Sequence, residues 1–283
     1  MRQPVIIFQG ISKNFGNNRI LNSIFLTINH GEKCLLRGKN GSGKTTFLKI
    51  AARLLYPDEG NIIYRGQNLY AIKKFQNRFP SYLTDQIDYY PHLTVKEWIY
   101  INNKIIKDFN IDLINKKFFM EKYQNYLIKN LSYGIKKRLF LSSVLARNSD
   151  LFLLDEPFKG LDKNFIDIAQ EYIFSLSEKT FIIASHEINS YQNYNQMIEI
   201  ISGKIHIMEK RNFPVFISTK PFKEDLLSQL NIQEWDNMLK IIKNQNCVSL
   251  QFRIENNHIK IGRLISMLIQ QGIHVNEIKD ESI

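Results

Sequence analysis

One glycine-rich segment constrains the fold of this chain more than any other feature. Residues 38–46 read Gly-Lys-Asn-Gly-Ser-Gly-Lys-Thr-Thr, directly after the short apolar run Lys33–Arg37. The following stretch, Thr45–Leu55, repeats apolar residues at helical spacing. The pattern G-x-x-x-x-G-K-[ST] between a strand and a helix is typical of a loop that wraps around phosphate groups. We therefore predict a strand, a phosphate-binding loop and a helix over residues 33–55.

The residue types of this loop indicate its chemistry. Glycines let the backbone turn tightly and point N–H groups at phosphate oxygens, and the helix N-terminus adds partial positive charge. Lys44 is expected to reach the β- and γ-phosphates of ATP, and the Thr45 hydroxyl to bind Mg²⁺. ATP and Mg²⁺ are therefore the predicted cofactors. The residues of the loop and helix start that we expect to bind them are Gly38, Asn40, Gly41, Ser42, Gly43, Lys44, Thr45 and Thr46.

A second motif supplies acidic groups. The apolar run Leu151–Leu154 predicts a strand buried on both faces of a mostly parallel sheet, and Asp155 and Glu156 follow it directly. Two adjacent acids at such a position are costly to bury without a cation or hydrogen bonds. Strand alternation points them in different directions. We assign Asp155 to the metal ion, and Glu156 to the water that attacks the γ-phosphate.

A third segment, Leu131-Ser132-Tyr133-Gly134-Ile135, begins a predicted helix before the acidic pair. With it, residues 1 to about 210 resemble the nucleotide-binding subunits of ABC transporters. In that family the segment caps the γ-phosphate held by a second subunit, so the resemblance implies that Ser132 and Gly134 contact ATP bound by a partner. The usual family pattern is Leu-Ser-Gly-Gly-Gln, from which Tyr133 and Ile135 depart.

The resemblance implies two further contacts with the nucleotide. Phe15 matches the aromatic residue on which adenine stacks, although a lone phenylalanine is equally compatible with a place in the core. His186, after the apolar run Phe181–Ala184, matches a switch histidine that contacts the γ-phosphate. It joins Lys44 and Glu156 as the third predicted catalytic residue.

Two more loops match the family by position. Asp162, in Gly160-Leu161-Asp162, matches a loop that crosses to the partner subunit. Where the family has a glutamine that touches Mg²⁺ and communicates with the membrane subunit, this chain offers Asp85 with Gln86 beside it. The choice between these two as the metal-side residue is open.

The resemblance also implies the fold. We expect an α/β P-loop NTPase with a mixed, mainly parallel sheet core, antiparallel strands and a helical subdomain at about 85–147. This ATP-binding domain covers residues 1–210, and a small α+β extension covers 211–283, after a change in composition near Lys210. The extension loosely resembles that of exporter ATPases, which favours export over import.

Periodicity predicts the individual elements. Further strands are expected at Val5–Gln9, Ile20–Ile28, Phe181–Ala184, Met197–Ile201, Ile205–Met208, Val215–Ser218, Val248–Ile254 and Ile273–Ile278. Helical patterns cover Thr94 to about Tyr126, Tyr133–Arg147, Lys223–Lys243 and Ile261–Gln271.

Charge and composition narrow the class of protein. The net charge is +11, and residues 96–147 hold eleven lysines and arginines against four acids, a local charge of +7. Such a balance suits nucleic acid, an anionic membrane surface or a solvated face, and the frequent Asn, Ile and Lys of the whole chain weaken the nucleic-acid interpretation.

No apolar run approaches the roughly 20 residues of a membrane span, and the N-terminus lacks a secretory signal. Cys34 and Cys247 lack metal-like spacing and are expected to be buried thiols.

These observations predict a cytoplasmic ATPase subunit, peripheral on the inner face of the cell membrane. It is expected to dimerise with a second ATPase subunit, as a homodimer, and to drive a separate transmembrane permease without binding specific nucleic acid. The alternative is a soluble ABC-type ATPase, such as an iron–sulfur assembly protein. Translation-associated members carry two ATPase halves, and DNA-repair members need a long coiled-coil insertion that this chain lacks. Glu156 and His186 disfavour a non-hydrolysing scaffold.

Overall fold

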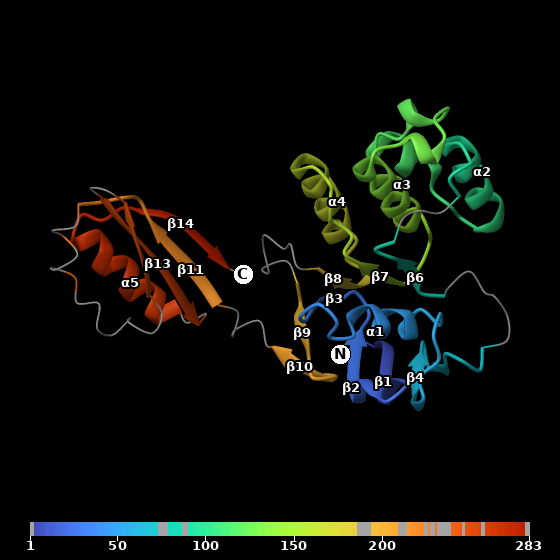
Figure 1. Cartoon of the computed structure of the whole chain (residues 1–283), viewed down its shortest axis with the longest axis horizontal. Coiled ribbons are helices and arrows are strands. Elements are labelled where there is room, and N and C mark those ends of the chain that lie inside the picture. The colour runs from blue at the N-terminus through green and yellow to red at the C-terminus, as the bar shows by residue number, and fades with distance from the viewer. Residues whose placement is uncertain are drawn as a thin grey trace. The chain divides into compact units, whose positions relative to one another are not determined.

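The computed structural model describes residues 3–72, 79–86, 90–185, 194–208, 214–223, 226, 230, 239–244, 247–255 and 258–280. The chain divides into two compact units, one formed by the described residues up to 207 and one by those that follow (Figure 1). Among the described residues, no helix is both long and apolar enough to cross a lipid bilayer.

A six-stranded sheet forms the centre of the larger unit. Its strand order is β10 (Lys204–Met208), β9 (Gln196–Ile201), β3 (Lys33–Arg37), β8 (Thr180–Ala184), β7 (Leu151–Asp155) and β6 (Ser81–Leu83). Strands β9, β3, β8, β7 and β6 run parallel. Every residue of β7 and β8 is buried, as expected for a strand covered on both faces. Because parallel strands end at the same edge, the loops after β3, β6 and β7 meet there.

A second, antiparallel sheet packs on the first through one helix. Its order is β2 (Asn18–Asn29), β1 (Pro4–Phe15), β4 (Glu59–Tyr64) and β5 (Gln67–Asn68). Helix α1 (Lys44–Ala51) contributes Phe47 and Ile50 to a hydrophobic core that includes residues of both sheets. The rings of Phe8 and Phe47 lie 4.6 Å apart. This core anchors the helix that follows the glycine-rich loop.

The other face of the six-stranded sheet carries helices α2 (Val95–Ile105), α3 (Tyr133–Leu145) and α4 (Lys163–Ser175), on the side opposite to α1 (Figure 1). Thr94 and Glu97 form a capping box at the start of α2. Between α2 and α3 the chain makes only short helical turns, at Leu113–Lys117, Glu121–Tyr123 and Ile128–Asn130.

Several predicted bounds were wrong. The expected helix from Thr94 to Tyr126 ends at Ile105, and Asp108 and Phe119 adopt positive φ angles that no helix contains. The helix expected to reach Leu55 ends at Ala51, two residues before Arg53 at φ 60°. Helix α4 and strands β4 and β6 were not predicted.

The smaller unit is an antiparallel sheet with one helix. Its strand order is β12 (Leu239–Asn244), β13 (Cys247–Glu255), β11 (Pro214–Thr219) and β14 (Val275–Asp280), and helix α5 spans His258–Gln270. Leu250 and Phe252 of the sheet pack with Leu264 and Leu268 of the helix. The helix predicted over Lys223–Lys243 was wrong at its end, because residues from Leu239 pair with β13.

Candidate functional site

The glycine-rich loop joins β3 to α1 and takes a conformation that needs glycine. Gly38 has a φ of 147°, and a Cβ atom there would lie 2.8 Å from the Ile200 carbonyl oxygen and 2.4 Å from the Ser42 hydroxyl. Gly43 caps α1 with a φ of 105°. The Ser42 hydroxyl oxygen is buried without a hydrogen-bond partner among the described residues. The loop therefore forms a cradle with a buried polar group that a phosphate oxygen would satisfy.

Lys44 begins α1 and turns its side chain back over the loop. Its ammonium donates to the carbonyl oxygens of Gly38 at 2.7 Å and Lys39 at 3.2 Å. Burial lowers the pKa of Lys44, while the negative charges of Glu156 and Asp155 oppose that effect. The ammonium and the helix N-terminus thus bring positive charge to the same place.

Two side chains whose oxygen atoms can bind a metal ion come from distant parts of the chain and meet beside Lys44. The Thr45 hydroxyl donates a 2.7 Å hydrogen bond to Asp155 Oδ2, across 110 residues of sequence. Asp155 ends β7 and is almost fully buried. Burial raises its pKa, the neighbouring Asp85 adds to the effect, and the Thr45 hydrogen bond opposes it. A hydroxyl and a carboxylate in contact are the oxygen donors that Mg²⁺ prefers, so the residues present fit this ion.

Glu156 leaves the strand in a different direction from Asp155. Its φ angle is 46°, and its backbone N–H donates to the carbonyl oxygen of Ala184 at the end of β8. The left-handed backbone, rather than strand alternation alone, therefore separates the two adjacent carboxylates.

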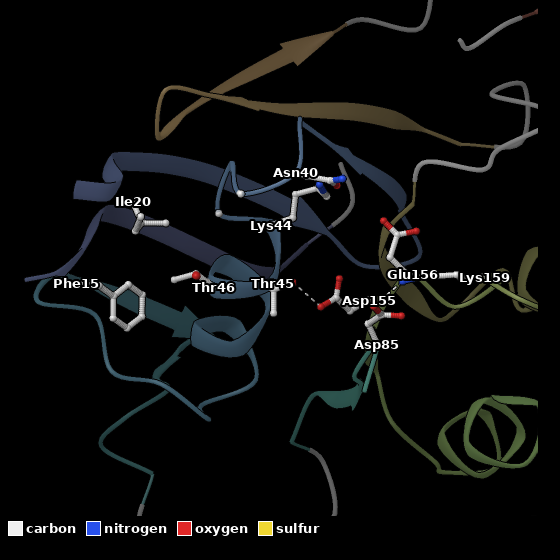
Figure 2. Close-up of a pocket in the computed structure, with 12 residues that line it drawn as sticks. Phe15, Ile20, Asn40, Lys44, Thr45, Thr46, Asp85, Asp155, Glu156 and Lys159 are labelled. Atoms are coloured by element: carbon white, nitrogen blue, oxygen red, sulfur yellow. Dashed lines mark hydrogen bonds and ion pairs between the residues drawn. The ribbon is translucent and has the colours of Figure 1, made fainter. Parts of the chain in front are cut away.

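These groups line one cavity of about 460 Å³ (Figure 2). Phe15 and Ile20 lie at one end, the carboxylates at the other, and Lys44 and Thr45 between them. Phe15 is 51% exposed, so it does not belong to the core. The complete lining is Phe15, Ile20, Asn40, Gly41, Gly43, Lys44, Thr45, Thr46, Asp85, Asp155, Glu156 and Lys159. An apolar end and a charged end of one cavity match the two parts of a nucleotide.

Asp85, two residues beyond β6, lies at the carboxylate end of the cavity. Its carboxylate forms ion pairs with Lys159 at 3.0 Å and Lys137 at 3.6 Å. Gln86 does not line the cavity, and its backbone N–H donates to the Thr84 hydroxyl. Of the two residues left open by the sequence, only Asp85 therefore lies at the cavity.

Ser132, Gly134 and Asp162 do not line this cavity and lie at the starts of α3 and α4. Ser132 caps α3, and a Cβ atom on Gly134 would lie 2.9 Å from the Gly160 carbonyl oxygen. Asp162 caps α4 and pairs with Arg138 of α3 at 2.9 Å. These contacts bring the starts of α3 and α4 together, and the surface there carries Ser132, Gly134 and Asp162. His186 lies outside the described residues.

Sequence reasoning missed three residues near the cavity. Ile20 and Lys159 line it, and Lys137 pairs with the lining residue Asp85. Ile20 lies on β2 and Lys137 on α3, so their place depends on tertiary contacts rather than on a local motif. Within the described part of the chain, no group of three or more His, Cys, Asp or Glu side chains is arranged to hold a metal ion.

Comparison with known proteins identifies the fold and the family. The sequence model described as ABC transporter matches residues 21–159. The "Probable sulfate/thiosulfate import ATP-binding protein CysA" of Chlorella vulgaris is 30% identical over 71% of this chain and 89% of its own length. The "ABC transporter ATP-binding protein YtrB" of Bacillus subtilis strain 168 is 28% identical over 79% of this chain and 75% of its own.

A solved structure agrees at the level of the fold. The ATP-binding cassette MJ0796, in a dimeric post-hydrolysis state with ADP and Pi, superposes with a TM-score of 0.66 over 74% of this chain and all of that one, at 21% identity. The expected P-loop NTPase fold is thereby confirmed. Members of the matched family bind and hydrolyse ATP, and the predicted ATPase activity is confirmed with it. The cavity, its cradle and the relatives together lead to one assignment: this chain belongs to the ABC transporter family, as an ATP-binding subunit.

Proposed function

We propose that this chain works as a dimer, holds ATP between two subunits and drives a separate transmembrane permease. The observation that carries the proposal is the hydrogen bond between Thr45 and Asp155, next to Lys44. It joins the phosphate loop to the acidic strand in the geometry that a magnesium–triphosphate site needs. In Figure 2 this bond lies at the middle of the cavity.

The glycine-rich loop and the side chains around it form the part of the cavity that binds the nucleotide, called the loop end below. Lys44 exchanges its contacts with the loop carbonyls for the β- and γ-phosphates, and the Ser42 hydroxyl and the loop N–H groups donate to phosphate oxygens. Thr45 and Asp155 are the residues that would hold Mg²⁺, whose charge would stabilise the negative oxygens of the triphosphate. Phe15 stacks on adenine, and Ile20 adds apolar contact at the same end of the cavity.

Hydrolysis takes place at the carboxylate end. Glu156 orients a water and accepts its proton as the water oxygen bonds to the γ-phosphorus. The bond from that phosphorus to the bridging β–γ oxygen breaks, which leaves ADP and phosphate. His186 is proposed to contact the γ-phosphate, as the family resemblance implies.

The surface of Ser132, Gly134 and Asp162 supports the dimer. The Ser132 side chain is exposed at the N-terminus of α3, where a helix attracts anions. Because none of these three residues lines the cavity of its own chain, the surface suits the γ-phosphate held by a second copy. The solved relative MJ0796 is a dimer in the post-hydrolysis state. We propose a homodimer of the ATP-binding domain, residues 1–210, with 211–283 as a separate domain.

The membrane partner is proposed from the family and from charge. The local +7 charge of residues 96–147 suits the anionic inner leaflet, where each basic residue near the surface contributes about 1 kcal/mol. We therefore propose a cytoplasmic location on the inner face of the membrane, against a permease. Export is proposed as the direction, supported by the resemblance of residues 211–283 to exporter extensions.

Glu156→Gln tests the catalytic and dimeric parts together. We expect ATP hydrolysis to fall by about 100-fold or more, because the acceptor of the water proton is lost. ATP binding is retained, and sedimentation with Mg-ATP shows a stable dimer. The matched control, Glu171→Gln on the exposed side of α4, keeps wild-type turnover. Turnover of Glu156→Gln near the wild-type rate would remove this residue from catalysis.

The partner and direction need a membrane assay. Co-expression with a candidate permease should yield a complex whose ATPase rate depends on the permease. In inside-out vesicles, added ATP reaches the subunits, so export is measured as ATP-dependent accumulation of a labelled cargo inside. Accumulation only in vesicles of the opposite orientation would reverse the direction.

A further inference from the structure

The carboxylate of Asp85 lies between two ammonium groups from different elements. Lys137 Nζ, from α3, is 3.6 Å from Asp85 Oδ1, and Lys159 Nζ, from the loop after Glu156, is 3.0 Å from Oδ2. Figure 2 shows Lys159 and Asp85 beside Asp155 at the carboxylate end of the cavity. Each oxygen of one carboxylate therefore has its own cationic partner.

The inner partner, Lys137, is an unusual side chain for its position. It is 0% exposed, on a helix whose buried neighbours include Leu139 and Leu141. Its ammonium makes no hydrogen bond of ordinary length among the described residues. Burial lowers its pKa, and the charge of Asp85 is the largest opposing cause. A buried lysine is costly unless it is paired, so the ion pair with Asp85 is what makes the charge tolerable.

The two oxygens of Asp85 differ in their surroundings. Oδ1, which faces Lys137, is buried and lacks a hydrogen bond within the described residues. Oδ2 accepts a hydrogen bond from Lys159, whose side chain is 53% exposed and lines the cavity. An exposed ammonium on a flexible side chain exchanges partners easily, whereas a fully buried one does not. The inner contact is therefore fixed and the outer one replaceable.

We propose that Lys137 is a positioning residue that holds Asp85 by its inner oxygen at the magnesium end of the cavity. The outer oxygen then exchanges between Lys159 and the hydration shell of the ion. This inference rests on the proposed Mg-ATP site at Lys44, Thr45 and Asp155. Lys137 lies one helical turn beyond the start of α3, so the ion pair also links the Ser132–Gly134 surface to the chain's own nucleotide.

The test is the gain in ATP affinity that Mg²⁺ provides, measured by calorimetry as the ratio of Kd in EDTA to Kd in excess Mg²⁺. Lys137→Met should lower this gain about threefold to tenfold. Loss of a positive charge near a cation site would by itself strengthen cation binding. A reduced gain therefore reports a displaced Asp85 rather than a changed charge. Lys129→Met, on an exposed turn before α3, should keep the wild-type gain.

Two further variants separate positioning from general damage. Asp85→Asn should lower the gain as much as Lys137→Met, and the double variant should lower it no further, because both act on one group. Lys159→Gln should raise the gain about twofold, because the competing partner of Oδ2 is removed. Opposite signs for two lysines that bind one carboxylate are not expected from a structural role.

The outcomes distinguish this inference from the function on which it rests. A wild-type protein that binds no ATP in either buffer overturns both. Normal wild-type binding with an unchanged gain in Lys137→Met, or with additive losses in the double variant, overturns the positioning role alone. If Lys137→Met does not fold, Asp85→Asn decides, because an unchanged gain there would leave Lys137 no metal-side group to position.

Discussion

The two ends of the phosphate cavity are built in different ways. At the loop end, the predicted contacts come from consecutive residues, 38–46, and depend on backbone conformation. At the carboxylate end, Asp85 follows β6, whereas Asp155 and Lys159 belong to β7 and the loop after it, so two separate segments meet because their strands end at one sheet edge. The first end is local in sequence and the second is a product of the fold.

The two ends also differ in the free-energy cost of burying their charged groups. The loop end buries one charge, the Lys44 ammonium, which donates to two backbone carbonyl oxygens, and its other positive groups are backbone amides and a helix N-terminus. The other end buries Asp155 and Lys137 almost completely, and burial disfavours the charged form of each. We therefore expect the loop end to determine nucleotide affinity, and the carboxylate end to lower stability in return for metal binding.

The largest expected effect is loss of the loop-end cation. Lys44→Ala should weaken ATP binding about 100-fold, in Mg²⁺ and in EDTA alike, because a charge-assisted contact to two phosphates is lost. Equilibrium binding of a fluorescent ATP analogue measures it. Lys49→Ala, in the last turn of the same helix, removes the same charge away from the cavity and should bind normally. Equal binding by both variants would contradict the division between the two ends.

A smaller effect should separate backbone shape from charge at the loop end. Gly38→Ala places a methyl group 2.8 Å from a backbone oxygen, so the loop must move, and ATP affinity should fall about tenfold. Gly66→Ala is the matched control, since Gly66 also has positive φ, at 77°, no atom lies within 4 Å of its added Cβ, and it does not line the cavity. It should lose only about 1 kcal/mol of stability through strain. Thermal melting and nucleotide titration of both variants measure the two quantities.

The same contrast explains what the sequence could predict. The loop was predictable because its motif, its strand and its helix are adjacent along the chain. The position of Asp155 was also predictable, because four apolar residues before two acids indicate the end of a buried strand. Lys137 gave no local signal, because its ion pair joins α3 to the segment after β6. Charge pairs between distant elements depend on the tertiary fold.

Two misjudged segments show where local patterns fail. Helix α4 was missed although its signal was present, with Asp162 as a cap and buried Phe165, Ala169 and Ile173 at four-residue spacing. In the smaller unit, residues from Leu239 follow a helical period in sequence yet form β12, because pairing with β13 outweighs a weak periodicity. Helix periodicity near a strand partner is therefore the least secure signal.

The smallest expected effect tests the cost of the carboxylate end. Asp155→Asn removes a buried charge but keeps an oxygen that accepts from Thr45, so the nucleotide-free protein should gain about 1 kcal/mol, or about 2–4 °C in Tm, at pH 7. The raised pKa of Asp155 means that the folded protein binds more protons than the unfolded chain just above the ordinary carboxyl range. Wild-type stability at this residue therefore rises as the pH falls through that window, and the advantage of the variant should narrow near pH 5. Mg-ATP should stabilise the wild type more than the variant. A variant that melts below the wild type at pH 7 would show that the Asp155 charge stabilises the fold, and the two ends would then not differ in their cost.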